Sequence, residues 1–280
     1  MLEILSYEFM QNALLAGMLA SVICGIIGVY VVLKRIVFIS GGIAHFSFGG
    51  IGVGYYLGVN PLLAALGFSV LAALAIGASK DRMDLQEDTS IGILWAVGMA
   101  AGVIFVGLSK GYAVNLFSYL FGNILAVSRT DLALMAALGL GIVCTVAALY
   151  KEFLAIAFDE EYAETLGIPT RWLYVLLLCL IALSIVILIK VVGVILVIAL
   201  LTIPASIARL YATTVRGMMV LATGAGMVLA TTGLMASYYA DLASGATIVI
   251  VSALAFFSLS LMRRHQVQAW RARAVRRHNQ

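Results

Sequence analysis

Long apolar runs alternate with short polar stretches along most of the chain. About nine of the runs are long enough to cross a hydrocarbon core of about 30 Å, which takes about 20 helical residues. These runs lie at 9–33, 36–58, 62–79, 90–108, 131–150, 172–189, 191–210, 217–238 and 245–262. The pattern predicts an all-α integral membrane protein with about nine transmembrane helices, within a range of roughly 8 to 10.

The stretch 151–171 is the one long polar island between these runs, and it holds five of the 13 acidic residues. Its middle has the residues of a short helix. Asp159 can cap the start, Glu160 and Glu161 fall in the first turn, and Gly167 can end the helix in a left-handed conformation. We expect a helix of about seven residues that rests against other parts of the protein, because so short a helix is unstable alone in water. A solvated loop between two spans is the alternative.

Composition excludes a water-soluble domain, since 64% of the residues are hydrophobic and only 11% are charged. We expect a single transmembrane domain at 1–262 and a basic cytoplasmic tail at 263–280. The six arginines of the tail read as a positive-inside anchor that could also contact anionic lipid or a partner subunit, and nothing indicates a nucleic-acid partner. Cys24, Cys144 and Cys179 stand alone in apolar runs, so no disulfide framework is expected.

The distribution of charge predicts the topology. If the amino terminus lies outside and the carboxy terminus lies in the cytoplasm, all of the 17 basic residues except Lys110, Arg129 and Lys190 fall on the cytoplasmic side. The apolar segment 111–128 would reverse this bias if it crossed the membrane. We therefore expect it to be re-entrant or to lie on the outer face, which places the polar island 151–171 in the cytoplasm.

The source of energy that such a membrane protein could use is also constrained by the sequence. No acidic residue lies in the middle of a predicted span, whereas ion-driven carriers usually keep carboxylates there. No phosphate-binding loop of the G-x-x-x-x-G-K-[ST] type occurs either, so ATP would have to be hydrolysed by a separate polypeptide. A secondary transporter or a channel that works without ATP is the alternative.

Four motifs, spread over the chain, carry a family resemblance. They are E-x-A-x-x-x-G at 161–167, VVGVILVIALLTIPASIARL at 191–210, SYLFGNILAVSRTDL at 118–132 and LKRIVFISGGIAHFSFGG at 33–50. Together they resemble the permease subunits of zinc, manganese and iron ABC importers, the ABC-3 family. The resemblance implies a type II importer fold in a prokaryotic cell membrane, a permease homodimer, ATPase subunits below it and an extracytoplasmic metal-binding protein above it. It implies that the divalent metal is cargo and that the chain binds no cofactor of its own.

The same resemblance implies that the polar island is the loop that meets the ATPase. The coupling residues would then be Asp159, Glu160, Glu161, Ala163, Leu166 and Gly167. Pro204 interrupts a predicted span, and we expect a kink there that could serve as a gating bend.

His45 is the residue that we expect to handle the ion. It is the only histidine in a predicted span and lies about nine residues, roughly 14 Å, along its helix, near the bilayer midplane. A neutral imidazole suits a transition metal, and a dimer would bring two of them to the shared axis. Packing, with a hydrogen bond to a carbonyl, is the alternative.

This chain departs from the family at one position of that site. Many members carry an aspartate one turn before the histidine, where this chain has Gly41, followed by Gly42. Backbone carbonyls of these two glycines could supply ligands instead, or the site could be weaker and transient. Zinc is expected slightly ahead of manganese and iron, and a siderophore or cobalamin permease is the alternative within ABC importers.

Overall fold

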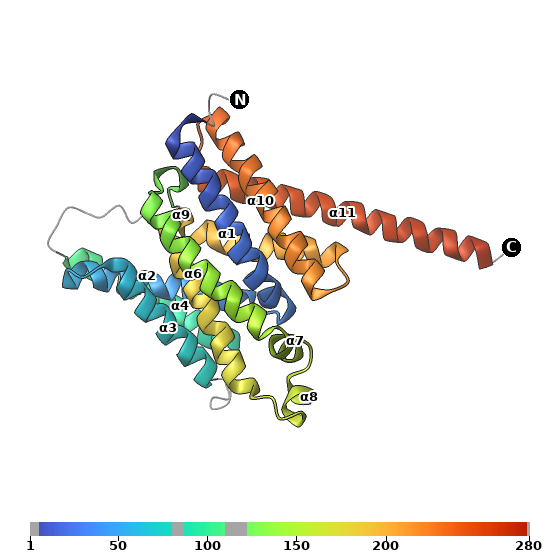
Figure 1. Ribbon diagram of the computed structural model, residues 1–280, viewed down its shortest axis with the longest axis horizontal. Helices are drawn as coiled ribbons and strands as arrows, with labels where there is room; N and C mark the ends of the chain where they lie inside the picture. Colours follow the sequence, from blue (N-terminus) through green and yellow to red (C-terminus); the bar gives the residue numbers. More distant parts are fainter. Residues whose placement is uncertain (1–5, 80–86, 110–121, 279–280) are drawn as a thin grey trace.

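The computed structural model describes residues 6–79, 87–109 and 122–278, and the elements within these ranges are all helical. They are α1 (Glu8–Leu33), α2 (Val37–Leu57), α3 (Pro61–Ser79), α4 (Glu87–Leu108), the 3-10 turn η2 (Ile124–Ala126), α6 (Arg129–Ala148), α7 (Tyr150–Phe158), α8 (Glu160–Thr165), α9 (Thr170–Tyr211), α10 (Val215–Ala240) and α11 (Ser244–His278). Most predicted spans match a helix to within a few residues. The exceptions are α9 and α11 (Figure 1).

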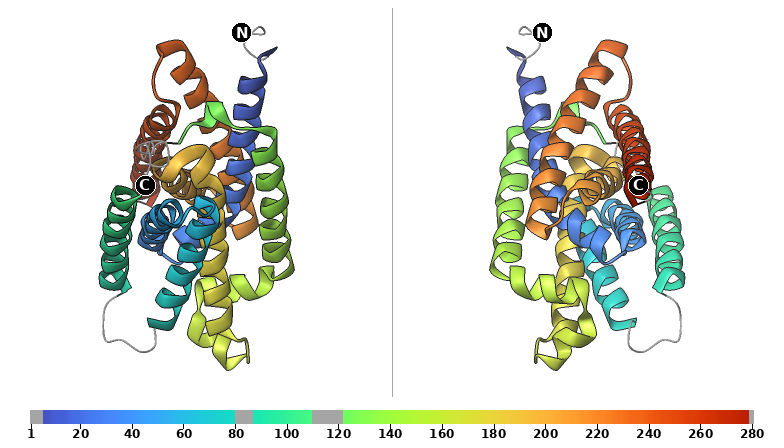
Figure 2. Two further views of the ribbon diagram at one scale, coloured as in Figure 1. Left: turned by 90° about the vertical axis from the view of Figure 1, so that its left-hand side faces the viewer. Right: turned by 90° about the vertical axis from the view of Figure 1, so that its right-hand side faces the viewer.

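Helix α9 contains the two spans predicted at 172–189 and 191–210. Its 42 residues correspond to about 63 Å of helix, twice what one crossing needs. The backbone breaks at Gly193, where φ is 78° and ψ is 161°, a conformation open to glycine. Figure 2 shows the second part of α9 turned away from the axis of the first. Eight helices of the described chain are long and apolar enough to cross a membrane, and α9 is long enough to do so twice.

One end of the bundle is marked by α7 and α8, and we call it the α8 end. Helix α1 finishes there, because the Nζ atom of Lys34 lies 3.0 Å from Oε2 of Glu160. Helix α9 also finishes there, because an Nη1 atom of Arg209 donates to the carbonyl oxygen of Val32 at 3.3 Å. The amino terminus lies at the opposite end of α1 (Figures 1 and 2).

The opposite end, which we call the Ser128 end, is where α6 begins. Lys190, near the end of the first part of α9, pairs there with Asp131 of α6 at 2.6 Å. The first part of α9 therefore runs from the α8 end to the Ser128 end, and the second part runs back. Helix α10 then returns to the Ser128 end. Helix α11 runs back toward Tyr211, at the end of α9, whose hydroxyl donates a hydrogen bond to the carbonyl oxygen of Leu259 in α11.

The segment 111–128 is predicted to stay on the outer face of the membrane. Its residues 111–121 lie outside the described residues. The helices on either side of it can still be placed. Gly41 of α2 faces Trp95 of α4, and Gly52 faces Gly102, so α2 and α4 run in the same direction and both finish at the Ser128 end. Helix α6 begins at that same end.

Close packing of helix backbones holds α2 in place. A Cβ atom added to Gly49 would lie 2.8 Å from the carbonyl oxygen of Gly98 in α4, and one added to Gly50 would lie 2.6 Å from that of Ala64 in α3. Small residues allow such approaches in a membrane, where packing rather than water exclusion drives helix association. Helices α4 and α11, by contrast, expose large apolar side chains on the outside, such as Ile104.

The boundary predicted between the transmembrane domain and the tail falls inside one element. Helix α11 continues without a break from Ser244 to His278, over 35 residues. Figure 1 shows it extending well past the other helices. The predicted tail at 263–280 is thus a continuation of the last membrane helix as far as the described residues reach.

Candidate functional site

The polar island folds as the sequence predicts, with a capped start. Asp159 has an extended backbone, and its Oδ1 atom accepts a hydrogen bond from the backbone N–H of Tyr162 at 2.9 Å. Glu160 and Glu161 occupy the first turn of α8, where the helix dipole favours anions. Ala163 is fully buried and anchors α8 to the core of the bundle.

The end of α8 depends on Gly167. Its φ is 77°, and its N–H bonds to the carbonyl oxygen of Glu164 at 2.9 Å while the N–H of Ile168 bonds to that of Ala163 at 3.1 Å. This pair of bonds is a Schellman motif, which needs a left-handed residue at this position. The hydroxyl of Thr170 also donates to Oε1 of Glu164 at 2.7 Å. These bonds fix the direction in which the chain leaves α8 for α9.

Lys34 connects this loop to the end of α1. Its side chain is only 9% exposed, and its ammonium group donates to the carbonyl oxygen of Ile156 at 2.8 Å as well as to Glu160. The same ammonium group lies 5.2 Å from the ring centre of Tyr174 in α9. One buried cation thus connects the end of α1 to α8 and to α9.

The outer surface of this loop is apolar. Phe158, Tyr162, Leu166 and Trp172 are between 60% and 76% exposed. A pocket of about 300 Å³ lies beside them and is lined by residues from Glu164 to Trp172. Exposed apolar residues grouped around a pocket are typical of a protein–protein contact.

His45 lies near the middle of α2, about 12 Å along a helix of about 31 Å. Its ring stacks on Trp95 of α4 with centroids 4.1 Å apart and an angle of 13° between the planes. Its Nδ1 atom lies 3.2 Å from the Sδ atom of Met99, one turn further along α4. Two atoms that can bind a transition metal, an imidazole nitrogen and a thioether sulfur, are thus adjacent at mid-depth.

Gly41 and Gly42 lie inside the regular part of α2 and are buried against α4. A Cβ atom on Gly41 would lie 3.0 Å from the ring of Trp95. The carbonyl groups of Gly41 and Gly42 belong to a helical segment. That these carbonyl groups bind the metal ion stays a prediction. Among the residues that the structure describes, no group of three or more His, Cys, Asp or Glu could hold a metal ion.

Helix α9, which contains the sixth and seventh predicted spans, breaks at Gly193, three residues after Lys190, which separates the two predicted spans. Pro204 is buried, within a stretch that has helical dihedral angles, and its part in gating stays a prediction. Gly122, with φ of 69°, lies directly against the backbone of Val192, leaving no room for a Cβ atom. Two left-handed glycines from distant segments therefore meet where α9 changes direction.

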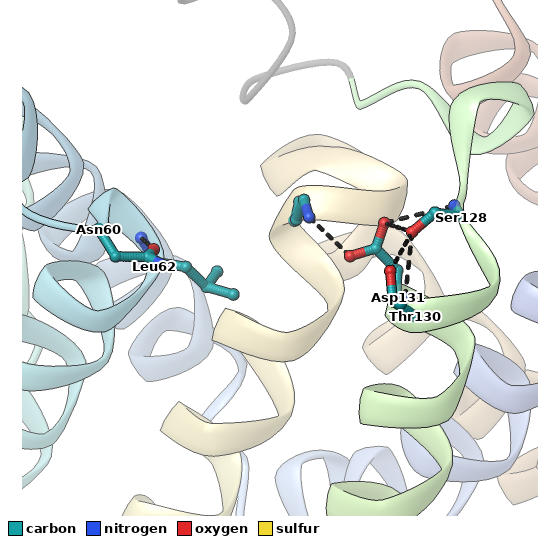
Figure 3. A network of polar contacts seen from close by, with 6 residues as sticks. Asn60, Leu62, Ser128, Thr130 and Asp131 are labelled. Atoms are coloured by element: carbon teal, nitrogen blue, oxygen red, sulfur yellow. Dashed lines mark hydrogen bonds and ion pairs between the residues drawn. The ribbon is translucent and has the colours of Figure 1, made fainter.

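A polar network lies at the Ser128 end, close to this break. The hydroxyl of Ser128 accepts from the backbone N–H of Asp131 at 3.2 Å, and the Asp131 carboxylate accepts in turn from the backbone N–H of Ser128 at 3.3 Å, which forms a capping box. Figure 3 shows Ser128, Thr130 and Asp131 grouped at the first turn of α6. The other carboxylate oxygen of Asp131 binds Lys190, so the network joins α6 to α9 just before Gly193.

A family model, described as the ABC 3 transport family, matches residues 6–263. The chain belongs to the ABC-3 transport family. An uncharacterized membrane protein of Synechocystis sp. is 49% identical over 264 residues, which cover 94% of each chain. A manganese transport system membrane protein of Halalkalibacterium halodurans is 36% identical over 259 residues, covering 91% of this chain and 89% of that one.

Solved structures agree with the ABC-3 fold. A chain of the structure described as PsaBC from Streptococcus pneumoniae in complex with Fab has a TM-score of 0.83 and 32% identity, over 92% of this chain and 93% of that one. A putative metal-chelate type ABC transporter in an inward-facing conformation has a TM-score of 0.71 at 16% identity, which supports the fold alone. The predicted all-helical, type II importer fold is confirmed.

Family membership decides several further predictions. As an ABC-3 permease, the chain is a multi-pass membrane subunit of a bacterial transporter and is not itself an ATPase. Such a permease works with ATPase subunits and a binding protein. The alternative of a transporter or channel that works without ATP is therefore wrong.

Three residues around the site give no signal of their role in the sequence pattern. Lys34 reads as an ordinary charge at the end of a span, although the structure buries it against Glu160. Met99 reads as one apolar residue among many, although its sulfur contacts His45. Only two valines stand between Lys190 and Gly193, so the sequence pattern does not show whether Gly193 breaks the helix or only allows close packing.

Proposed function

We propose that this chain is the permease through which an ATP-driven importer carries a divalent transition metal, with zinc as its preferred cargo. The contact between His45 and Met99 is the observation that carries the proposal. A divalent cation in a low-dielectric region needs ligands in place of its water shell. These two side chains offer nitrogen and sulfur at mid-depth, from two helices that pack tightly together.

The choice of zinc rests on ligand chemistry. Imidazole and sulfur suit zinc, whereas carboxylate, carbonyl and water oxygens suit manganese. Position 41, where many ABC-3 members have an aspartate, is glycine in this chain. Several relatives at 32–36% identity are described as manganese transport proteins, and the loss of this carboxylate supports a different preference here.

The orientation that we propose places the α8 end in the cytoplasm. Lys34, Arg209, Arg216 and Arg263 all contact residues at the α8 end of the bundle. Basic residues are enriched on the cytoplasmic side of membrane proteins. With this orientation, the amino terminus lies outside and the basic end of α11 lies in the cytoplasm.

The proposed partners follow from that orientation. The apolar surface around α8, with its pocket, would receive the ATPase, and Asp159, Glu160, Glu161, Ala163, Leu166 and Gly167 would form or support the contact. The Ser128 end would face the binding protein. A homodimer would bring two copies of His45 and Met99 to one pathway, giving four ligands, the number that zinc usually takes.

Metal uptake tests the cargo directly. Cells that lack the gene should lose zinc, measured by inductively coupled plasma mass spectrometry, and regain it when the gene is restored. Uptake of radioactive zinc should resist an excess of manganese. A loss of manganese with unchanged zinc would make the chain a manganese permease, and uptake of chelated metal alone would favour a siderophore or cobalamin permease.

Labelling of single cysteines tests the orientation. A variant without the natural cysteines should be labelled from outside by a membrane-impermeant thiol reagent at Ser128→Cys, which is exposed at the cap of α6. Phe158→Cys, exposed between α7 and α8, should be labelled only after the membrane is opened. The reverse pattern would invert the proposed orientation.

A further inference from the structure

A groove on the outside of the bundle lies between α6 and α10. Both helices pack on α1 but not closely on each other, so α1 forms the floor. The groove has a volume of about 620 Å³, and its walls are almost entirely aliphatic, with Val143 and Ala147 from α6, Met219 and Val220 from α10, and Ile26 from α1. A cavity of this size is within the range of natural ligand sites.

Among the described residues that line the groove, the one cation lies at its mouth. Arg216 is exposed in the first turn of α10, and its Cζ atom lies 4.8 Å from the ring centre of Tyr150. The lining contains no carboxylate, and no acidic side chain among the described residues pairs with Arg216. The N-terminus of a 26-residue helix adds a partial positive charge at the same point. The mouth therefore favours an anion, whereas the rest of the groove favours hydrocarbon.

The position along the membrane fits an amphipathic ligand. Arg216 and Tyr150 lie at the α8 end, where tyrosine and arginine side chains are common at the level of lipid headgroups. The groove extends from there along α1 toward residues such as Val22, which belong to the apolar middle of the helix.

We propose that this groove binds an anionic phospholipid from the leaflet at the α8 end. Its phosphate would lie on Arg216 and the N-terminus of α10, and one acyl chain would lie on α1 between α6 and α10. The proposal does not depend on which metal is transported. Bound lipid would fill a gap that the two helices leave open and would brace α10 against α6.

A second copy of the chain fits this groove less well. Helix α4, which carries Met99 and packs on α2 and α3, lies on the side of the molecule away from α6, as Figure 2 shows. A dimer that shares the pathway near His45 would use the α4 side. The groove would then face the lipid.

Native mass spectrometry of the protein from nanodiscs of mixed phosphatidylglycerol and phosphatidylcholine tests the proposal. The natural protein should retain phosphatidylglycerol in preference. Arg216→Gln should weaken this retention by about fivefold, the effect of one basic residue near an anionic surface. Arg264→Gln, another exposed arginine at the α8 end but outside the groove, is the matched control and should behave like the natural protein.

Filling the groove gives an independent measurement. Ala147→Phe adds a ring where the side chain is exposed into the groove, so the fold should tolerate it while retention of both lipids falls. Equal retention of the two lipids by the natural protein, or equal loss in the two arginine variants, would overturn the proposal. So would conversion of a dimer to monomers by Ala147→Phe with lipid retention unchanged, which would identify the groove as a contact between copies.

Discussion

Replacement of His45 by alanine should lower metal uptake by at least about tenfold, because changes even to residues that only orient a metal ligand cost about 10- to 100-fold. The transporter should still assemble and hydrolyse ATP, since the ring contributes only its contacts with Trp95 and Met99 to an otherwise intact interface between α2 and α4. His45→Gln, which keeps hydrogen bonding but has no imidazole, should transport almost as poorly. Uptake of radioactive zinc and ATP hydrolysis in proteoliposomes measure the two effects.

Met99→Leu separates the role of the sulfur from that of the imidazole. Leucine conserves the volume of methionine, so the stability cost should stay below about 1.5 kcal/mol. Zinc uptake should fall while ATP hydrolysis is unchanged. Met135→Leu, at a fully buried methionine in α6, is the matched control and should leave zinc uptake intact.

Two outcomes would contradict a pathway role. If His45→Gln restores transport while His45→Ala destabilises the protein, then His45 is a packing residue. If Met99→Leu and Met135→Leu affect zinc uptake equally, the sulfur of Met99 does not bind the ion.

Replacement of Gly167 by valine should separate ATP hydrolysis from transport. A β-branched residue at φ of 77° costs about 1–3 kcal/mol in backbone strain, although the space around Gly167 is open. The loop can relieve this strain by breaking the two backbone hydrogen bonds, from the N–H groups of Gly167 and Ile168, that end α8. The loss of these bonds would change the direction of α8 relative to the ATPase. We expect hydrolysis to continue and metal uptake to fall about tenfold, a loss that a change of about 1.4 kcal/mol in coupling can produce.

Gly58 provides a matched control for strain. It ends α2 with φ of 68°, again in open space, but at the Ser128 end. Gly58→Val should therefore cost similar stability and leave hydrolysis coupled to uptake. Gly167→Asn should retain most transport, because asparagine tolerates the left-handed conformation. Normal transport by Gly167→Val, or equal uncoupling by Gly58→Val, would contradict the role given to α8.

Most of the fold could be predicted because its signals are local. The length of an apolar run sets where a helix can cross the membrane, and a capping residue sets where a short helix begins. Asp159 and Gly167 bond to groups only a few residues away, so the sequence around them is enough to predict where α8 begins and ends. The break in α9 was predicted to within three residues, because Lys190 separates the two apolar runs, but the residue at which the backbone breaks is Gly193.

The sequence by itself thus determined the number and approximate limits of the spans, the capped helix in the polar island, the family and the position of His45. Only the tertiary structure decided which residues meet. Lys34 and Glu160 are 126 positions apart, and His45 and Met99 are 54 apart. Membrane helices are apolar on nearly all sides, so their hydrophobic pattern does not reveal which face packs on a neighbour and which faces lipid. The partner of Lys34, the sulfur beside His45, the break at Gly193 and the groove at Arg216 all depend on that choice of faces.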